Sequence, residues 1–432
     1  MVDIKNIVVF GDSMSDIGNK WTWPTGELGR LLNQLGIGGM RVNETGRFSD
    51  GRNWTDFLVQ WATGESLMWG NRDLAIRKST DHRTLTMFSS LEVSSWDMPP
   101  QVKPPTGPNT TLDDLLAYIQ EGRKQETRQR LPEVKYVNYA MGGSIAANDW
   151  APKFGALTYL RSQVEDYLAQ RASLSRPLEG DTLHVIWIGL NDFVTALRPD
   201  YDRAEFKDLP AENEYGLWKA WAEGHKKELE KKGGVGAFPA VEEVRLLVEA
   251  INQAFPPEKN HFMVMDLPSV YNAVRYMDFP DTKPAKLEEA KRIDPVIDTF
   301  NEILVDLLKN WPGPNAPAGD HRHIVEVSKW MRHVSANLDG YKLLKQPQDH
   351  GVKPFYNPAV PPGPTTDPVP SGMRRRITTS DLGHPSEAVY ELIAGHFVTR
   401  MLAENYTLGR LTMDSWVKNN PFGTVALDYM ES

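Results

Sequence analysis

The sequence contains no cysteine, and this absence removes several kinds of chemistry at once. A chain of 432 residues without a thiol has no disulfide, no cysteine-bound zinc and no cysteine nucleophile. It also has no run of about 18 apolar residues, so we expect no transmembrane helix. No internal repeat is visible. With 40% apolar and 24% charged residues, the composition is that of a globular protein able to bury a large core.

An excess of positive charge is lacking as well. The chain has 48 Lys and Arg against 57 Asp and Glu, which gives a formal net charge of −9. Nucleic-acid binding favours clustered positive charge, so we expect no nucleic-acid partner. The acidic balance gives no general attraction to anionic membranes, although transient contact through a local basic patch stays open. The sequence does not indicate an oligomeric state.

No signal peptide precedes the first apolar run, which begins at Ile4. The expectation is therefore a cytoplasmic protein, or a secreted one whose leader has been removed. The sequence does not choose between these compartments.

Five short apolar runs have the continuous character of strands buried on both faces. They occupy residues 4–10, 134–140, 182–188, 261–267 and 323–327. Amphipathic helical patterns lie between them, at 157–171, 241–255 and 297–311. This alternation predicts an α/β fold, an open and mostly parallel sheet with helices on both sides. Ligands of such sheets bind beyond the carboxyl ends of the strands.

These strands and helices account for about half of the chain, and long segments separate them. We expect insertions at about 20–130, 196–238 and 346–375, the last of which is too rich in proline for a helix or a central strand. The charged run at 226–234 predicts a solvated helix ending at Gly233. We favour one elaborated domain over residues 1–432.

Four segments at strand ends have the residue types of an acyl-transfer site. The first is Gly11-Asp12-Ser13, where a serine directly follows a buried strand and can present its hydroxyl above the sheet. The second is Gly142-Gly143 in "NYAMGGS", where a glycine N–H can remain available to an anion. Each segment taken alone is more often an ordinary turn.

The other two segments supply an amide and a base. In "IGLNDF", the Asn191 side chain can donate to an oxyanion, whereas Asp192 is expected to cap the next helix. In "SDLGHPSEAVY", Asp381 and His384 are three residues apart, and Pro385 suits the first position of a helix. A carboxylate at this spacing can hold the imidazole tautomer, which leaves the other ring nitrogen to accept a serine proton.

Taken together and in this order, "FGDSMSDIGN", "NYAMGGS", "GLND" and "DLGHP" resemble the four blocks of the GDSL family in the SGNH hydrolase superfamily. The stretches 46–58 and 266–273 resemble secondary blocks of the longer GDSL lipases and esterases. The resemblance implies a flavodoxin-like three-layer α/β/α sandwich with five parallel strands. It also implies serine-dependent ester hydrolysis through an acyl-enzyme, without metal or cofactor.

The resemblance also implies roles for individual residues. Ser13 would be the nucleophile, His384 the general base and acid, and Asp381 the residue that orients His384. The oxyanion hole would comprise the Ser13 and Gly143 N–H groups and the Asn191 side chain. Gly143 is preferred to Gly142 because the glycine of the family pattern lies five places after an asparagine, here Asn138.

The substrate is less well defined by the sequence. Three consecutive cations, Arg374, Arg375 and Arg376, could hold a substrate phosphate, although a charge run is more often a solvated surface. We favour lipid or phospholipid acyl esters. The alternatives are a short-chain or acetyl esterase acting on carbohydrate or small esters, and an acyltransferase using the same triad. Tryptophans of the first insertion could line such a site, but core packing is the more common role; they are Trp21, Trp23, Trp54, Trp61 and Trp69. The histidines show no metal-binding spacing, and we expect no metal site.

Overall fold

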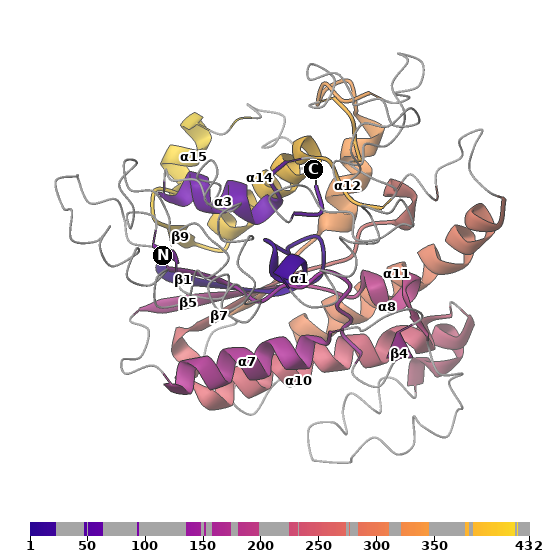
Figure 1. Ribbon diagram of the computed structural model, residues 1–432, viewed down its shortest axis with the longest axis horizontal. Helices are drawn as coiled ribbons and strands as arrows, with labels where there is room; N and C mark the ends of the chain where they lie inside the picture. Colours follow the sequence, from indigo (N-terminus) through magenta and orange to yellow (C-terminus); the bar gives the residue numbers. More distant parts are fainter. Residues whose placement is uncertain are drawn as a thin grey trace.

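The computed structural model describes the central sheet, most of its helices and the loops at the carboxyl ends of the strands (Figure 1). The described residues are 1–22, 47–49, 51–63, 93–94, 135–147, 151–152, 158–173, 180–197, 224–231, 233–273, 276, 284–310, 321–344, 376–379, 383–419 and 421.

Five parallel strands form the sheet, in the spatial order β3-β1-β5-β7-β8. Their bounds are Val2–Gly11 (β1), Lys135–Asn138 (β3), Asp181–Trp187 (β5), Asn260–Met265 (β7) and Arg322–Val325 (β8). Numbered along the chain, these strands have the order 2-1-3-4-5, which is the flavodoxin-like topology. The expected fold class and all five expected strands are thus confirmed. The order reverses at β1, and a ligand is expected at that switch point.

Short strands extend or accompany this sheet. β9 (Tyr406–Leu408) pairs in parallel with the first residues of β1, and β2 (Val93–Ser94) pairs antiparallel with β3. A separate two-stranded sheet joins β4 (Ala151–Pro152) to β6 (Ala196–Leu197). The sequence did not predict β9, because three residues are too few to show a hydrophobic period.

One face of the sheet is covered by α7 (Leu160–Ser173), α10 (Phe238–Ala254) and α11 (Pro284–Asn310), as Figure 1 shows for α7 and α10. These are the three expected helices, although α11 begins well before the expected position 297. Its first turns are charged, so the apolar periodicity there is weak, and the helix continues through Pro295. Along the chain, the predicted charged helix at 224–231 and η2 (Gly234–Ala237) come between α7 and α10, and η3 (Pro257–Lys259) follows α10. Gly233, after the charged helix, is left-handed with φ 70°.

The opposite face carries α3 (Trp54–Thr63) and α14 (Glu387–Ala403), which pack on each other. α12 (Val327–Ala336) and α15 (Met413–Asn419) lie beside α14. The short elements α1 (Asn19–Thr22), α8 (Leu190–Val194) and η4 (Val270–Asn272) stand at the carboxyl ends of strands. α3 falls in the range expected as an insertion, yet its residues belong to the core.

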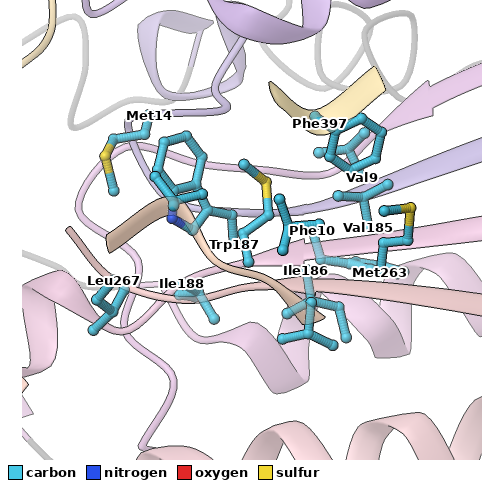
Figure 2. Packing of buried hydrophobic residues seen from close by; sticks show 14 of the residues in the cluster. Val9, Phe10, Met14, Val185, Ile186, Trp187, Ile188, Met263, Leu267 and Phe397 are labelled. Carbon is cyan, nitrogen blue, oxygen red and sulfur yellow. The ribbon is translucent and has the colours of Figure 1, made fainter. Parts of the chain in front are cut away.

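Strand side chains alternate between the two layers. Figure 2 shows Val9, Val185 and Phe397 of α14 gathered on one side, with Ile186 on the other. Trp54 of α3 is fully buried, and its ring lies 5.0 Å from Phe397. Removing such a side chain typically costs about 3–5 kcal/mol. Of the tryptophans considered for a substrate wall, Trp54 therefore serves the core.

Candidate active site

The nucleophile candidate lies where β1 ends. β1 runs to Gly11, and Asp12 and Ser13 form the turn that follows, closed by a hydrogen bond from the Ser15 N–H to the Asp12 carbonyl (3.1 Å). A Cβ at Gly11 would lie 2.6 Å from the Trp187 carbonyl oxygen of the neighbouring strand. Glycine is therefore required for close packing of β1 on β5.

Ser13 contacts the histidine expected to be its base. The His384 Nε2 lies 2.8 Å from the Ser13 Oγ, although the two residues are 371 positions apart in the chain. Ser13 is 8% exposed, so the hydroxyl is reachable but largely shielded. The Phe48 ring packs against the imidazole at a centroid distance of 5.0 Å. This pair has the geometry in which a histidine accepts a serine proton.

His384 is placed by a loop rather than by the first turn of a helix. α14 begins at Glu387, and its N-cap is Ser386, whose hydroxyl accepts from the Val389 N–H. The expectation that Pro385 occupies the first helical position is therefore wrong. Pro385 instead forms an isolated bridge with Thr379, and the Ser386 hydroxyl donates to the Ile377 carbonyl at 2.6 Å. Asp381 lies outside the described residues.

Gly143 has the available amide that the sequence suggested. It has φ 81°, a conformation that favours glycine. Among the described residues, none accepts a hydrogen bond from its N–H, and the same holds for the Ser13 N–H. The N–H of the preceding residue, Gly142, is engaged, because it donates to the Asp16 Oδ2 at 2.7 Å.

The backbone N–H groups on both sides of Gly143 all donate hydrogen bonds. Ser144 N–H donates to the Met141 carbonyl and Ile145 N–H to the Thr158 carbonyl. Beyond them, the two carboxylate oxygens of Asp192 accept from the Ala146 and Ala147 N–H groups, at 2.9 and 2.8 Å. Within the run from 142 to 147, Gly143 alone keeps a backbone donor without an acceptor among the described residues.

Asn191 lies in the first turn of α8, beyond the end of β5. Its Nδ2 donates to the Ser144 carbonyl at 3.1 Å, and its Oδ1 accepts from the Thr195 hydroxyl at 3.0 Å. An amide NH₂ carries two protons, so one remains for a ligand. The expectation that Asp192 caps this helix is wrong, because Gly189 is the N-cap residue and no side chain caps it. Burial raises the pKa of Asp192 to about 7.

Asp16 and Asn19, to which the sequence assigned no role, organise the loop after β1, residues 12–19, which carries Ser13 (the nucleophile loop). Asp16 is fully buried and accepts from the N–H groups of Gly18, Asn19, Lys20 and Gly142. Burial raises the pKa of this carboxyl to about 6, against the effect of those four donors. Asn19 donates from its side chain to the Asn138 and Ala140 carbonyls, both at 2.9 Å. The loop after β1 is thereby fastened to the loop after β3.

The segment 47–56 supports the same loop from the α14 side. The Asn53 Nδ2 donates to the Asp16 carbonyl at 3.1 Å, and the Trp54 Nε1 donates to the Ser15 Oγ at 3.0 Å. A buried pair between Arg47 and Asp56 (2.8 Å) holds the segment itself. Within the stretch 46–58, Asn53 and Trp54 thus contact the nucleophile loop through their side chains.

Sequence reasoning missed Gln163 of α7. Its Oε1 accepts from the Gly11 N–H at 2.9 Å, while its Nε2 donates to the Gly11 carbonyl at 2.8 Å and to the Ser144 Oγ at 3.0 Å. Gln163 is 3% exposed. A signal was present, because this glutamine falls on the stripe that Leu160, Val164 and Tyr167 share. A polar residue on a buried stripe needs polar partners.

Asp12 is part of the Ser13 turn and carries a buried carboxyl group. Its Oδ1 accepts from the Met14 N–H at 3.0 Å, and its Oδ2 is buried without a partner. Burial raises the pKa of Asp12 to about 7, while the Met14 N–H and the charge of His384 act in the opposite direction.

A hollow of about 260 Å³ opens beside the Ser13–His384 pair. Its wall includes Asn191 but not Arg376. Arg376 is exposed and lines a different hollow, beside Lys342 and Asp339. Arg374 and Arg375 lie outside the described residues. Of the three arginines, the structure describes Arg376, and this residue does not line the hollow beside Ser13.

Among the described residues, no group of three His, Asp or Glu side chains is arranged to hold a metal ion. None of the described helices is both long enough and apolar enough to span a bilayer.

Comparisons with known proteins add little to this geometry. No protein-family model and no curated protein matches the chain. Among solved structures, the chain is similar to a Parabacteroides merdae ATCC 43184 protein described as a GDSL-like lipase, with 12% sequence identity and a TM-score of 0.37. The match covers 92% of this chain and 96% of that one. A superposition this loose supports no assignment, so the fold and the site rest on the contacts described above.

Proposed function

We propose that this chain is a serine ester hydrolase of the GDSL type, built as one hydrolase domain. The observation that carries the proposal is the 2.8 Å contact between the Ser13 Oγ and the His384 Nε2 at the switch point of the sheet. The four sequence blocks of that family support it, since the described parts of all four lie at this edge.

In the proposed mechanism, His384 accepts the hydroxyl proton through Nε2 while the Ser13 Oγ attacks the ester carbonyl carbon. The carbonyl oxygen becomes an oxyanion, which accepts from the Ser13 and Gly143 N–H groups and from the Asn191 Nδ2. His384 then gives the proton to the alkoxide leaving group, and an acyl-enzyme remains. Water, deprotonated by His384, attacks the acyl carbon and releases the acid and Ser13. Asp381 is proposed to orient the imidazole during these transfers.

The substrates we favour are lipid acyl esters, because the wall of the hollow at Ser13 is mainly apolar. A phospholipid headgroup has less support, since Arg376 lines another hollow. An acetyl esterase and an acyltransferase would use the same nucleophile and base. Adding an alcohol acceptor and measuring the transesterified product separates transfer from hydrolysis.

The test is Ser13→Ala, assayed on p-nitrophenyl esters. Loss of the covalent step should lower kcat by at least about 10⁴-fold, as removal of a serine nucleophile does elsewhere. A fluorophosphonate should label the unmodified protein at Ser13 and leave the variant unlabelled. Circular dichroism and the thermal midpoint establish that both proteins are folded. A folded wild-type protein that cleaves no ester, or an alanine variant with full activity, would refute the proposal.

A further inference from the structure

The hollow beside Ser13 is bounded by separate parts of the chain that meet around the carboxyl ends of β5 and β7. They are α8, the segment 268–276 that contains η4, the α12 region and the start of α14. Ser13 and His384 lie in its wall, so a chain attached to the attacked carbonyl has direct access to it. The hollow is therefore placed to hold one side of the ester.

The wall is suited to an uncharged, apolar chain. Its apolar side chains come from all four parts, and they include Val194, Val270, Met331, Val334, Leu338 and Ile393. Asp12 and His384 are the only acidic or basic side chains among the described residues that line it, and both adjoin the nucleophile. A charged group in the rest of the hollow would lose its hydration without gaining an ion pair.

Hydrogen bonds fix the position of the wall. The Ser269 hydroxyl and the Val270 N–H both donate to the Asp294 Oδ1 of α11, at 2.7 and 2.9 Å. The Ser335 hydroxyl of α12 donates to the Asn272 Oδ1 of η4 at 3.1 Å, which joins two walls of the hollow. These hydrogen bonds fasten the segment 268–276 to α11 and to α12, so three parts of the chain hold this side of the hollow together.

The volume of the hollow limits the size of the chain it can hold. An apolar cavity of about 150 Å³ holds one benzene molecule, which has six carbon atoms, so a hollow of about 260 Å³ holds about ten heavy atoms, enough for an ester group with an acyl chain of six to eight carbons. We infer that this hollow is the acyl subsite of the proposed esterase and that it selects uncharged acyl chains of about six to eight carbons. The inference rests on the proposed function and adds to it the substrate class. Palmitoyl chains exceed the hollow, and acetyl groups leave it unfilled.

The first test is kcat/KM for p-nitrophenyl esters from acetyl to palmitoyl, each below its critical micelle concentration. Burial of one methylene is worth up to about 0.8 kcal/mol, or about fourfold in rate, so kcat/KM should climb steeply from acetyl to hexanoyl or octanoyl. It should then level off or fall. An ester whose acyl chain ends in a carboxylate should react at least about tenfold more slowly than the neutral ester of equal length.

The second test changes the size of the hollow. Val334→Phe fills it and should move the optimum toward butyryl, whereas Met331→Ala enlarges it and should move the optimum toward decanoyl. Val417→Phe and Met413→Ala are the matched controls, because both residues lie exposed on α15 and neither lines the hollow. The controls should keep the wild-type profile.

The outcomes separate the two proposals. A folded wild-type protein that cleaves no ester refutes the proposed function. Cleavage with acetyl preferred, or with no dependence on chain length, leaves the esterase standing and overturns the acyl-subsite inference. So does an unchanged optimum in either hollow variant. The two variants stress packing in opposite directions, so a folding defect in Val334→Phe leaves Met331→Ala as the test.

Discussion

Gln163 offers a sharp perturbation, because one side chain fastens two loops of the site. It accepts from the Gly11 N–H and donates to the Gly11 carbonyl and the Ser144 Oγ. Gln163→Leu keeps the approximate shape and removes all three hydrogen bonds. The Gly11 carbonyl would still accept from the Met141 N–H at 3.1 Å, and Ser144 would keep its contact with the Thr158 hydroxyl. The Gly11 N–H would lose the acceptor that Gln163 provides.

The magnitude follows from this inventory. A buried N–H without an acceptor costs about 1–3 kcal/mol, and each of the other two lost bonds costs about 1 kcal/mol. The added apolar surface of leucine returns about 1 kcal/mol. We therefore expect Gln163→Leu to lower the free energy of unfolding by about 2–4 kcal/mol. Since Gly11 lies two residues before Ser13, the proposed nucleophile, a small shift of the turn should also lower kcat by about tenfold or more, with KM nearly unchanged.

The assay is urea unfolding together with ester hydrolysis, with Gln60→Leu as the control. Gln60 lies on α3, and its Oε1 accepts a hydrogen bond from Arg52. Its replacement should cost less than about 1 kcal/mol and leave kcat unchanged. If Gln163→Leu matched this control in both stability and kcat, Gln163 would not position the nucleophile loop.

Gln163→Glu adds a pH dependence that a merely space-filling role would not show. One carboxylate oxygen can still accept from the Gly11 N–H, but the other would face the Gly11 carbonyl oxygen instead of donating to it. Burial and this repulsion raise the pKa of the introduced carboxyl in the folded state. The contribution of this carboxyl group to the free energy of unfolding is then fully present below the ordinary glutamate pKa of about 4.3. It is lost as the pH rises through the folded-state pKa. If Gln163→Glu lowered the free energy of unfolding relative to the wild type equally at pH 4.5 and pH 7.5, the result would contradict the role of the Gln163 Nε2 as a donor to the Gly11 carbonyl.

Two further predictions concern Asn191, the proposed oxyanion donor, and Asp12, the buried acid of the Ser13 turn. Asn191→Ala should lower kcat on p-nitrophenyl esters by about 10²–10³-fold, or about 3–4 kcal/mol, with KM within about twofold; a loss below about fivefold would exclude Asn191 as an oxyanion donor. Burial raises the pKa of Asp12 from 3.8 to about 7, so its contribution to stability is complete below about pH 4 and is lost as the pH rises to about 7. Asp12→Asn removes this titration, so the unfolding free energy of the variant minus that of the wild type should increase between pH 4 and 7, by up to about 1.4 kcal/mol per pH unit. If urea titrations showed the same difference in unfolding free energy between Asp12→Asn and the wild type from pH 4 to pH 7, the result would contradict the raised pKa of Asp12.

The central strands were predictable because each is buried on both faces and therefore reads as a continuous apolar run. Val8, Val9 and Phe10 of β1 are fully buried, as are Val185 and Ile186 of β5. Strands in the middle of a parallel sheet are covered by helices on both faces, so nearly every position must be apolar. The sequence blocks likewise predicted the contact between Ser13 and His384, because strand-end loops in a parallel sheet converge on one edge.

Other features depend on contacts that no local pattern contains. The helix was expected to start at Pro385, but Ser386 is the N-cap residue. The Ser386 hydroxyl is held at this position because it also donates to the Ile377 carbonyl, outside the helix. Asp192 looked like a helix cap because aspartate is a preferred N-cap residue, but its carboxylate accepts from backbone N–H groups 45 and 46 residues earlier in the chain. The partners of these side chains come from distant parts of the chain, so the spacing of residues in the sequence cannot predict them.

The available donor of Gly143 is best understood as the result of what its neighbours bind. Asp16 takes the Gly142 N–H from one side, and Asp192 takes the Ala146 and Ala147 N–H groups from the other. Both carboxyls are fully buried, and burial raises both pKa values despite these hydrogen bonds. Keeping two such groups in the interior lowers stability at neutral pH, since the folded state binds their protons more tightly than the unfolded chain does. The two buried carboxyls thus hold the loop after β3 in place at a cost in stability, which is the arrangement that the proposed oxyanion role of Gly143 requires.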